Sequence, residues 1–116
     1  MPRPTILVAE PEPAQALSVR KLVLETAKFN VLTAHSSREA LDLFRLFPNI
    51  NAAVLVSGGH IDCQSIATHI KETTTKVPII GVRCEDVDHR IPSYEPEQLV
   101  ALLRSLLGDP RTIDGQ

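Results

Sequence analysis

The chain of 116 residues is poor in aromatic side chains: it has three Phe, one Tyr and no Trp, although 43% of its residues are hydrophobic. A core made from this composition must be aliphatic, which suits a sheet covered by helices. The chain also lacks any long Gly/Ser or low-complexity stretch. We therefore expect one compact domain over residues 1–108, followed by a polar tail or the start of a linker over residues 109–116.

An excess of one charge and a long apolar segment are absent as well. The 12 basic and 14 acidic residues are interleaved and leave a formal net charge of −2. No basic stripe of the kind that follows a nucleic-acid backbone is formed. The first apolar run, "TILVA", is cut off by Glu10 and Pro11, so it is too short for a signal peptide or a membrane span. The sequence thus predicts a cytoplasmic protein with no membrane contact and no nucleic-acid binding through this domain.

Only two cysteines occur, Cys63 and Cys84, and neither lies in a segment with metal-ligand spacing. We expect two free thiols in a reducing cytosol rather than a disulfide. The histidines also lack the spacing of metal ligands on one helix face; they are His35, His60, His69 and His89. The sequence therefore predicts neither a metal site nor a cofactor.

Short apolar runs alternate along the chain with amphipathic segments. The runs cover residues 5–9, 29–34, 52–57 and 77–82, and a short edge strand is expected at residues 90–91. Each run is too short for a helix and largely apolar, which favours strands that are buried on both faces.

The segments between these runs predict helices. Residues 13–28 have a proline in the first turn and apolar residues at three- and four-residue spacing. Ser36 and Glu39 form a capping box that begins the next helix, and Pro48 stops it. We expect Leu41, Phe44 and Phe47 of that helix to face the core of the domain, because these three residues are spaced along one side of the helix.

Two further helices follow. Residues 61–71 predict a helix that Asp62 caps. The last helix begins near Pro96 and ends at Gly108. Its core stripe is expected to be Leu99, Leu102, Leu103 and Leu106, with Val100 and Leu107 left over for a homodimer contact.

Strands that alternate with helices predict an α/β fold: an open, doubly wound, five-stranded parallel sheet with helices on both faces. In such sheets, ligand-binding and catalytic groups gather at the carboxyl ends of the strands. The residues expected there are 10–12, 57–60 and 83–85.

At this point the chain resembles the receiver domain of bacterial two-component response regulators, over residues 4–107. "ILVAEPEP" is similar to the opening strand and acidic pair of that family, and "VLTAHSSREALDLF" to its second strand and helix. "FPNINAAVLVS" is similar to the strand that carries the phosphoacceptor, "VPIIGV" to the fourth strand and "SYEPEQLVALLRSLL" to the last helix. The resemblance implies a flavodoxin-like receiver fold and a role in phosphorelay signal transduction.

Receiver chemistry, as the resemblance implies it, needs an acidic pair for Mg²⁺, an aspartate that accepts phosphate, a small hydroxyl residue and a lysine. Glu10 falls on the first acidic position, Pro11 on the second, and Glu12 lies one residue beyond. Ser57 falls on the phosphoacceptor position, where a hydroxyl without an adjacent base is a poor nucleophile. A shifted alignment puts Val56 there, which is equally inert. We therefore expect no phosphotransfer, no turnover and no bound Mg²⁺.

The remaining pocket positions are altered too. Arg83 replaces the small hydroxyl residue. Pro92 and Ser93 lie where the lysine–proline dipeptide of the family would be expected, or the dipeptide has no true equivalent here. Arg83 could pair with Glu10 or Glu12 and act as an internal cation, or it could simply extend into solvent. Asp62 is the carboxylate nearest to Ser57 in the sequence. It could serve as a surrogate phosphoacceptor, or it could cap a helix.

The chain is also short after the fourth strand. Only eight residues separate Arg83 from Pro92, whereas a helix of about ten residues with two connections would need more. The fourth helix of the family is expected to be missing or shortened, which leaves apolar surface uncovered and favours a protein partner there. The expected partner surface is Glu85, Asp86, Arg90, Tyr94, Val100 and Arg104.

The favoured interpretation is a degenerate receiver, or pseudo-receiver, that binds a protein partner independently of phosphorylation and is not an enzyme. Two alternatives stay open. One is a conventional phosphorelay receiver with a shifted acceptor, and the other is a small nucleotide-binding α/β domain.

Overall fold

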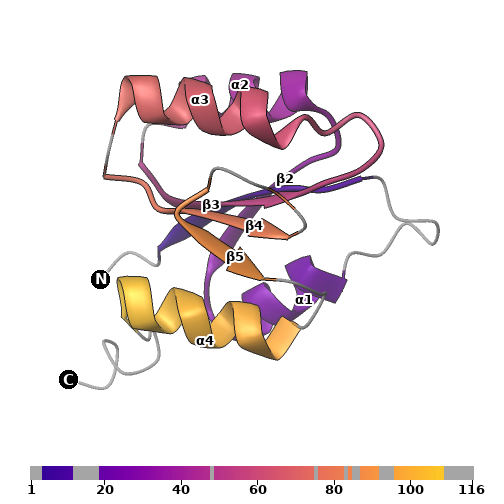
Figure 1. Cartoon of the computed structure of the whole chain (residues 1–116). Coiled ribbons are helices and arrows are strands. Elements are labelled where there is room, and N and C mark those ends of the chain that lie inside the picture. The colour runs from indigo at the N-terminus through magenta and orange to yellow at the C-terminus, as the bar shows by residue number, and fades with distance from the viewer. Residues whose placement is uncertain are drawn as a thin grey trace.

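The computed structural model describes residues 4–11, 19–47, 49–74, 76–82, 84, 87–91 and 96–108. Within these residues, strands and helices alternate along the chain (Figure 1). In order they are β1 (Thr5–Ala9), α1 (Val19–Thr26), β2 (Asn30–Ala34), α2 (Ser37–Leu46), β3 (Ile50–Val56), α3 (Cys63–Thr73), β4 (Ile79–Val82), β5 (His89–Ile91) and α4 (Pro96–Leu107). The first half of the helix predicted over residues 13–28 lies outside the described residues.

The five strands form one parallel sheet in the order β2-β1-β3-β4-β5. This is the strand order of the flavodoxin-like doubly wound fold, in which the order reverses between β1 and β3. The predicted fold class is therefore confirmed, including the short edge strand β5.

Helices cover both faces of the sheet: α2 and α3 lie on one face, and α1 and α4 lie on the other (Figure 1). Successive residues of the central strand β1 alternate between these faces. Ile6 and Val8 belong to the apolar cluster with α1 and α4, whereas Leu7 and Ala9 belong to the cluster with α2 and α3. All four are fully buried, which explains why the strand is apolar throughout.

Both predicted helix caps are present. The Ser36 hydroxyl accepts a hydrogen bond from the Glu39 N–H at 3.1 Å, and the Glu39 carboxylate accepts one from the His35 N–H at 3.0 Å. The return bond of this capping box therefore reaches one residue beyond the cap itself. Asp62 Oδ1 accepts a hydrogen bond from the Ser65 N–H at 3.2 Å at the start of α3. No helix in the described part of the chain is long and apolar enough to span a membrane.

Three predictions about the helix faces were wrong. Phe47 follows the end of α2 and is 45% exposed, because it no longer continues the buried side of the helix. In α4, the buried face contains Leu99, Val100 and Leu103, while Leu106 is 36% exposed. The helix is therefore rotated toward Val100, which at 7% exposure packs in the core and is not available to a partner.

The described residues of the connection from β4 to β5 are Cys84, Val87 and Asp88, and none of them is helical. Cys84 and Val87 pack into the cluster with α2 and α3. Asp88 Oδ2 accepts a hydrogen bond from the Ile79 N–H, at the start of β4, at 2.9 Å. The connection thus folds back over β4, so this part of the sheet is covered, contrary to the expectation of exposed apolar surface.

Gly81 allows this close approach. A Cβ atom at Gly81 would lie 2.7 Å from Cys84 Cβ and 2.9 Å from Val87 Cγ2. Real Cβ atoms do not come so close to their neighbours, so any side chain at this position would push the connection off the strand.

We therefore expect Gly81→Ala to lower the free energy of unfolding by about 1–3 kcal/mol, as overpacking does in other cores. Urea denaturation measures the change. Combining Gly81→Ala with Val87→Ala should recover part of the loss, because one of the two obstructing side chains is shortened. Strictly additive losses in the double variant would show that the connection does not pack on Gly81.

Candidate functional site

Three strands end side by side at one edge of the sheet. Ala9 of β1 pairs with Leu55 of β3, and Val56 of β3 pairs with Val82 of β4. The Ser57 N–H also donates to the Val82 carbonyl oxygen at 3.1 Å. The residues that follow β1, β3 and β4 therefore meet where the strand order reverses, which is the usual place for a site in this fold.

Glu10 follows β1 at this edge and is only 3% exposed. Its N–H donates to the Ala34 carbonyl oxygen at 3.0 Å, and its own carbonyl oxygen lies 3.2 Å from His35 Nδ1. A carbonyl oxygen can only accept, so Nδ1 carries the proton in this contact. The backbone of Glu10 is thus fixed by the end of β2, and its carboxylate is buried beside the site.

The Pro11 ring lies directly against the loop after β3. A Cβ atom at Gly58 would be 3.1 Å from Pro11 Cγ, and one at Gly59 would be 3.4 Å from Pro11 Cβ. Both glycines have positive φ angles, 134° and 54°, a conformation that favours glycine. An apolar ring therefore lies where the resemblance places the second acidic residue.

The described residues at this edge do not fit Mg²⁺. The ion requires a nearly octahedral shell of hard oxygen ligands. The described side chains here offer the Glu10 carboxylate and the Ser57 hydroxyl, while that of Pro11 offers no oxygen. Nowhere in the described residues do three or more His, Cys, Asp or Glu side chains form a group that could hold a metal ion.

Ser57, which the sequence pattern predicts at the phosphoacceptor position, is half-buried. A serine hydroxyl becomes an effective nucleophile when an adjacent base takes its proton. Among the hydrogen bonds within the described residues, none joins the Ser57 hydroxyl to a carboxylate or an imidazole. The described surroundings therefore do not activate it.

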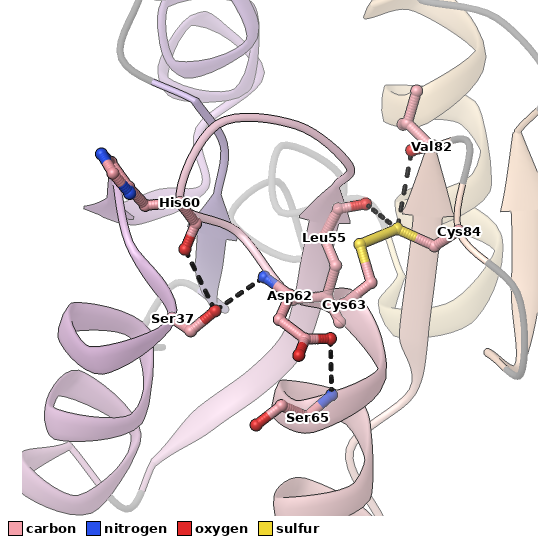
Figure 2. Close-up of a disulfide and its surroundings, with 8 residues drawn as sticks. All are labelled: Ser37, Leu55, His60, Asp62, Cys63, Ser65, Val82 and Cys84. Atoms are coloured by element: carbon pink, nitrogen blue, oxygen red, sulfur yellow. Dashed lines mark hydrogen bonds between the residues drawn. A yellow bond between two sulfur atoms is a disulfide. The ribbon is translucent and has the colours of Figure 1, made fainter.

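Ser37, the first residue of α2, holds the other side of the loop after β3. Its hydroxyl donates to the His60 carbonyl oxygen at 3.2 Å and accepts from the Asp62 N–H at 2.7 Å (Figure 2). Its N–H also donates to the His60 carbonyl oxygen, at 3.0 Å. The Asp62 carboxylate points to Ser65 as the cap of α3 (Figure 2). Sequence reasoning missed Ser37, because it looked like one more polar residue at a helix start.

Cys63 and Cys84 are joined by a disulfide (Figure 2), so the prediction of two free thiols was wrong. The two residues are 21 positions apart in the sequence. Cys63 begins α3, and Cys84 lies just after β4 at the same edge of the sheet. Their Cα atoms are 6.1 Å apart, which is within the range that a disulfide spans. Only the fold brings them together, since their spacing alone carries no pairing signal.

Only some of the other predicted site residues lie in the described part of the chain. Those outside the described residues are Glu12, Arg83, Glu85, Asp86, Pro92 and Tyr94. The pairing of Arg83 with Glu10 or Glu12 therefore stays a prediction. Arg90 is exposed on the edge strand β5, and Arg104 of α4 is half-buried.

Ser37→Ala removes both side-chain hydrogen bonds to the loop, and we expect it to lower the free energy of unfolding by about 1–2 kcal/mol. Ser105→Ala is the matched control, because Ser105 is exposed on α4 and its loss should change stability by less than about 0.5 kcal/mol. Equal effects of the two substitutions in urea denaturation would contradict a role for Ser37 in holding the loop.

Neither a protein-family model nor a curated protein sequence matches the chain. Solved structures do match it. A response regulator receiver domain protein from Clostridium thermocellum has a TM-score of 0.69 and 22% identity, over 95% of this chain and 98% of that one. The complex of CheX with CheY, BeF3 and Mg²⁺ from Borrelia burgdorferi matches with a TM-score of 0.73 and 16% identity, over 91% and 90% of the two chains.

A response regulator that also carries a GGDEF domain matches with a TM-score of 0.76 and 20% identity. It aligns with 90% of this chain, which spans about half (49%) of the length of that protein. At these identities the likeness concerns the fold. The chain therefore has the fold of the receiver domains of two-component response regulators.

Proposed function

We propose that the chain is a pseudo-receiver, a cytoplasmic signal-transduction module that binds a protein partner without accepting phosphate and without a bound cofactor. The observation that supports this most strongly is the packing of the Pro11 ring against Gly58 and Gly59. This packing uses the space beside Ser57 for an apolar contact, where a phosphoryl group and its metal ion would need oxygen ligands and a carboxylate.

Loss of the phosphorylation chemistry leaves the binding surfaces of a receiver fold in place. One neighbour in structure, the CheY protein of Borrelia burgdorferi, was solved in a complex with CheX. That complex supports the proposal that this chain also acts by binding another protein.

The partner surface that we propose is β5 with the connection that precedes it. β5 is one of the two edge strands of the sheet, and an edge strand presents unpaired backbone groups to a partner. Its exposed Arg90 adds a cation that can pair with an acidic residue. A second copy of the chain at this edge would give the homodimer that the sequence left open.

The nucleotide-binding alternative finds no support in the described residues. A groove with a volume of about 460 Å³ lies along α2 and α3, and its lining includes the carboxylates of Asp62 and Glu72. No Lys or Arg is among its lining residues. Two acidic side chains and no cation would repel the phosphates of a nucleotide.

The proposal predicts that acetyl phosphate with Mg²⁺ leaves the intact mass of the purified chain unchanged, because no carboxylate stands at the end of β3. A conventional receiver domain treated in parallel is the positive control and should gain one phosphoryl group.

A phosphoryl adduct that hydroxylamine removes would contradict the proposal, since it would be an acyl phosphate on an aspartate or glutamate. If Asp62→Asn no longer forms the adduct, the shifted-acceptor alternative is established. If Asp62→Asn still forms it, Glu10→Gln tests whether Glu10 is the acceptor.

A further inference from the structure

The disulfide lies beside the degenerate pocket and joins two elements that the sheet alone does not connect. Cys63 is the first residue of α3, and Cys84 belongs to the connection between β4 and β5. In the proposed function, that connection is part of the partner surface. A covalent bond at this place therefore restrains the segment that is proposed to contact the partner.

The connection is attached to the rest of the domain at three described points. The disulfide at Cys84 is the covalent one. Val87 packs into the apolar cluster with α2 and α3, and Asp88 Oδ2 accepts a hydrogen bond from the Ile79 N–H at 2.9 Å. Asp88 Oδ1 also lies 4.0 Å from Lys71 Nζ, with both side chains more than 40% exposed. Exposed ion pairs contribute little, so without the disulfide the connection is held by noncovalent contacts alone, chiefly the Asp88 hydrogen bond and the packing of Val87.

The surroundings of Cys84 suit the thiol as well as the disulfide. Cys84 Sγ lies 3.3 Å from the Leu55 carbonyl oxygen and 3.6 Å from the Val82 carbonyl oxygen (Figure 2). A disulfide sulfur has no hydrogen to donate, whereas a thiol at the same place can donate to either oxygen. Reduction would therefore create a polar group that already has a partner, and both redox states can be accommodated in the buried site.

Because we propose that the protein is cytoplasmic, we expect the disulfide to form and break reversibly. In a reducing cytosol, disulfides in proteins are usually transient or redox-sensing rather than structural. We propose that Cys63 and Cys84 form a thiol–disulfide switch that fastens the β4–β5 connection to α3 when oxidised and releases it when reduced. This inference rests on the proposed function, both for the compartment and for the role of the connection.

The reaction is ordinary thiol–disulfide exchange with glutathione. A glutathione thiolate attacks one sulfur of the pair and forms a mixed disulfide, while the other cysteine leaves as a thiolate and takes up a proton. A second glutathione then attacks the mixed disulfide. The chain gains two thiols, two glutathione molecules become one oxidised glutathione, and the reverse reaction closes the switch.

The first test equilibrates the purified chain in buffers with increasing ratios of reduced to oxidised glutathione. Free thiols are trapped with an alkylating reagent and counted by intact mass. We expect the two thiols to appear together, with the chain oxidised at the low ratios and reduced at the high ratios typical of cytosol. A chain that stays oxidised at every ratio would have a structural disulfide, and one that stays reduced at every ratio would have none; either result overturns the switch.

The second test measures amide hydrogen exchange in the two states. The Ile79 amide should exchange at least about tenfold faster in the reduced chain, because its acceptor Asp88 lies on the released connection. The Glu10 amide, which donates to the Ala34 carbonyl oxygen inside the sheet, should not change. Equal exchange of Ile79 in both states would contradict control of the connection, even if the bond itself forms.

Cys84→Ser provides the matched control. Its hydroxyl can donate to the Leu55 carbonyl oxygen as the thiol would, so the variant should show the reduced exchange pattern in every buffer. Cys63→Ser should do the same from the other side of the bond. The acetyl phosphate experiment is independent of these readouts: a phosphoryl adduct would overturn the proposed function with the thiol count unchanged, and an unresponsive thiol pair would overturn only the switch.

Discussion

The contact between the Pro11 ring and the Gly58–Gly59 turn lies at the middle of the carboxyl edge of the sheet. β1 and β3 are neighbours at the point where the strand order reverses, so whatever follows these two strands must share one small space. Here that space contains an apolar ring and two glycines with positive φ angles. In the function that we propose, this apolar contact takes the space that a carboxylate pair and its metal ion would need.

The neighbouring interactions depend on the path that this turn sets. After the glycines, the loop passes Ser37, which binds it through the His60 carbonyl oxygen and the Asp62 N–H. It then enters α3 at Cys63, which is bonded to the connection after β4. The loop is therefore held by β1, by α2 and by the β4–β5 connection. A loop held in this way is suited to the surface role that we propose. The disulfide is the covalent bond among these attachments, and thiol–disulfide exchange can open it.

The sequence predicted those features that depend on local patterns. The order of strands and helices, the parallel sheet, and the caps at Ser36 and Asp62 all follow from residues close together in the chain. The disulfide, the loop contacts of Ser37 and the burial of Val100 do not, because each depends on how separate elements are positioned against one another. That Ser57 stands in place of a carboxylate is implied by the resemblance and stays a prediction, whereas the packing of Pro11 against the glycine turn could be found only from the fold.

Amide hydrogen exchange at the loop after β3 tests the central claim most directly. The Ile61 amide donates to the Gly58 carbonyl oxygen at 3.0 Å and the Asp62 amide donates to Ser37 Oγ. The account predicts that in the oxidised chain both exchange slowly, at rates close to those of the β3 amides, and that adding Mg²⁺ changes neither rate. Fast exchange of both amides, or a clear change when Mg²⁺ is added, would contradict it.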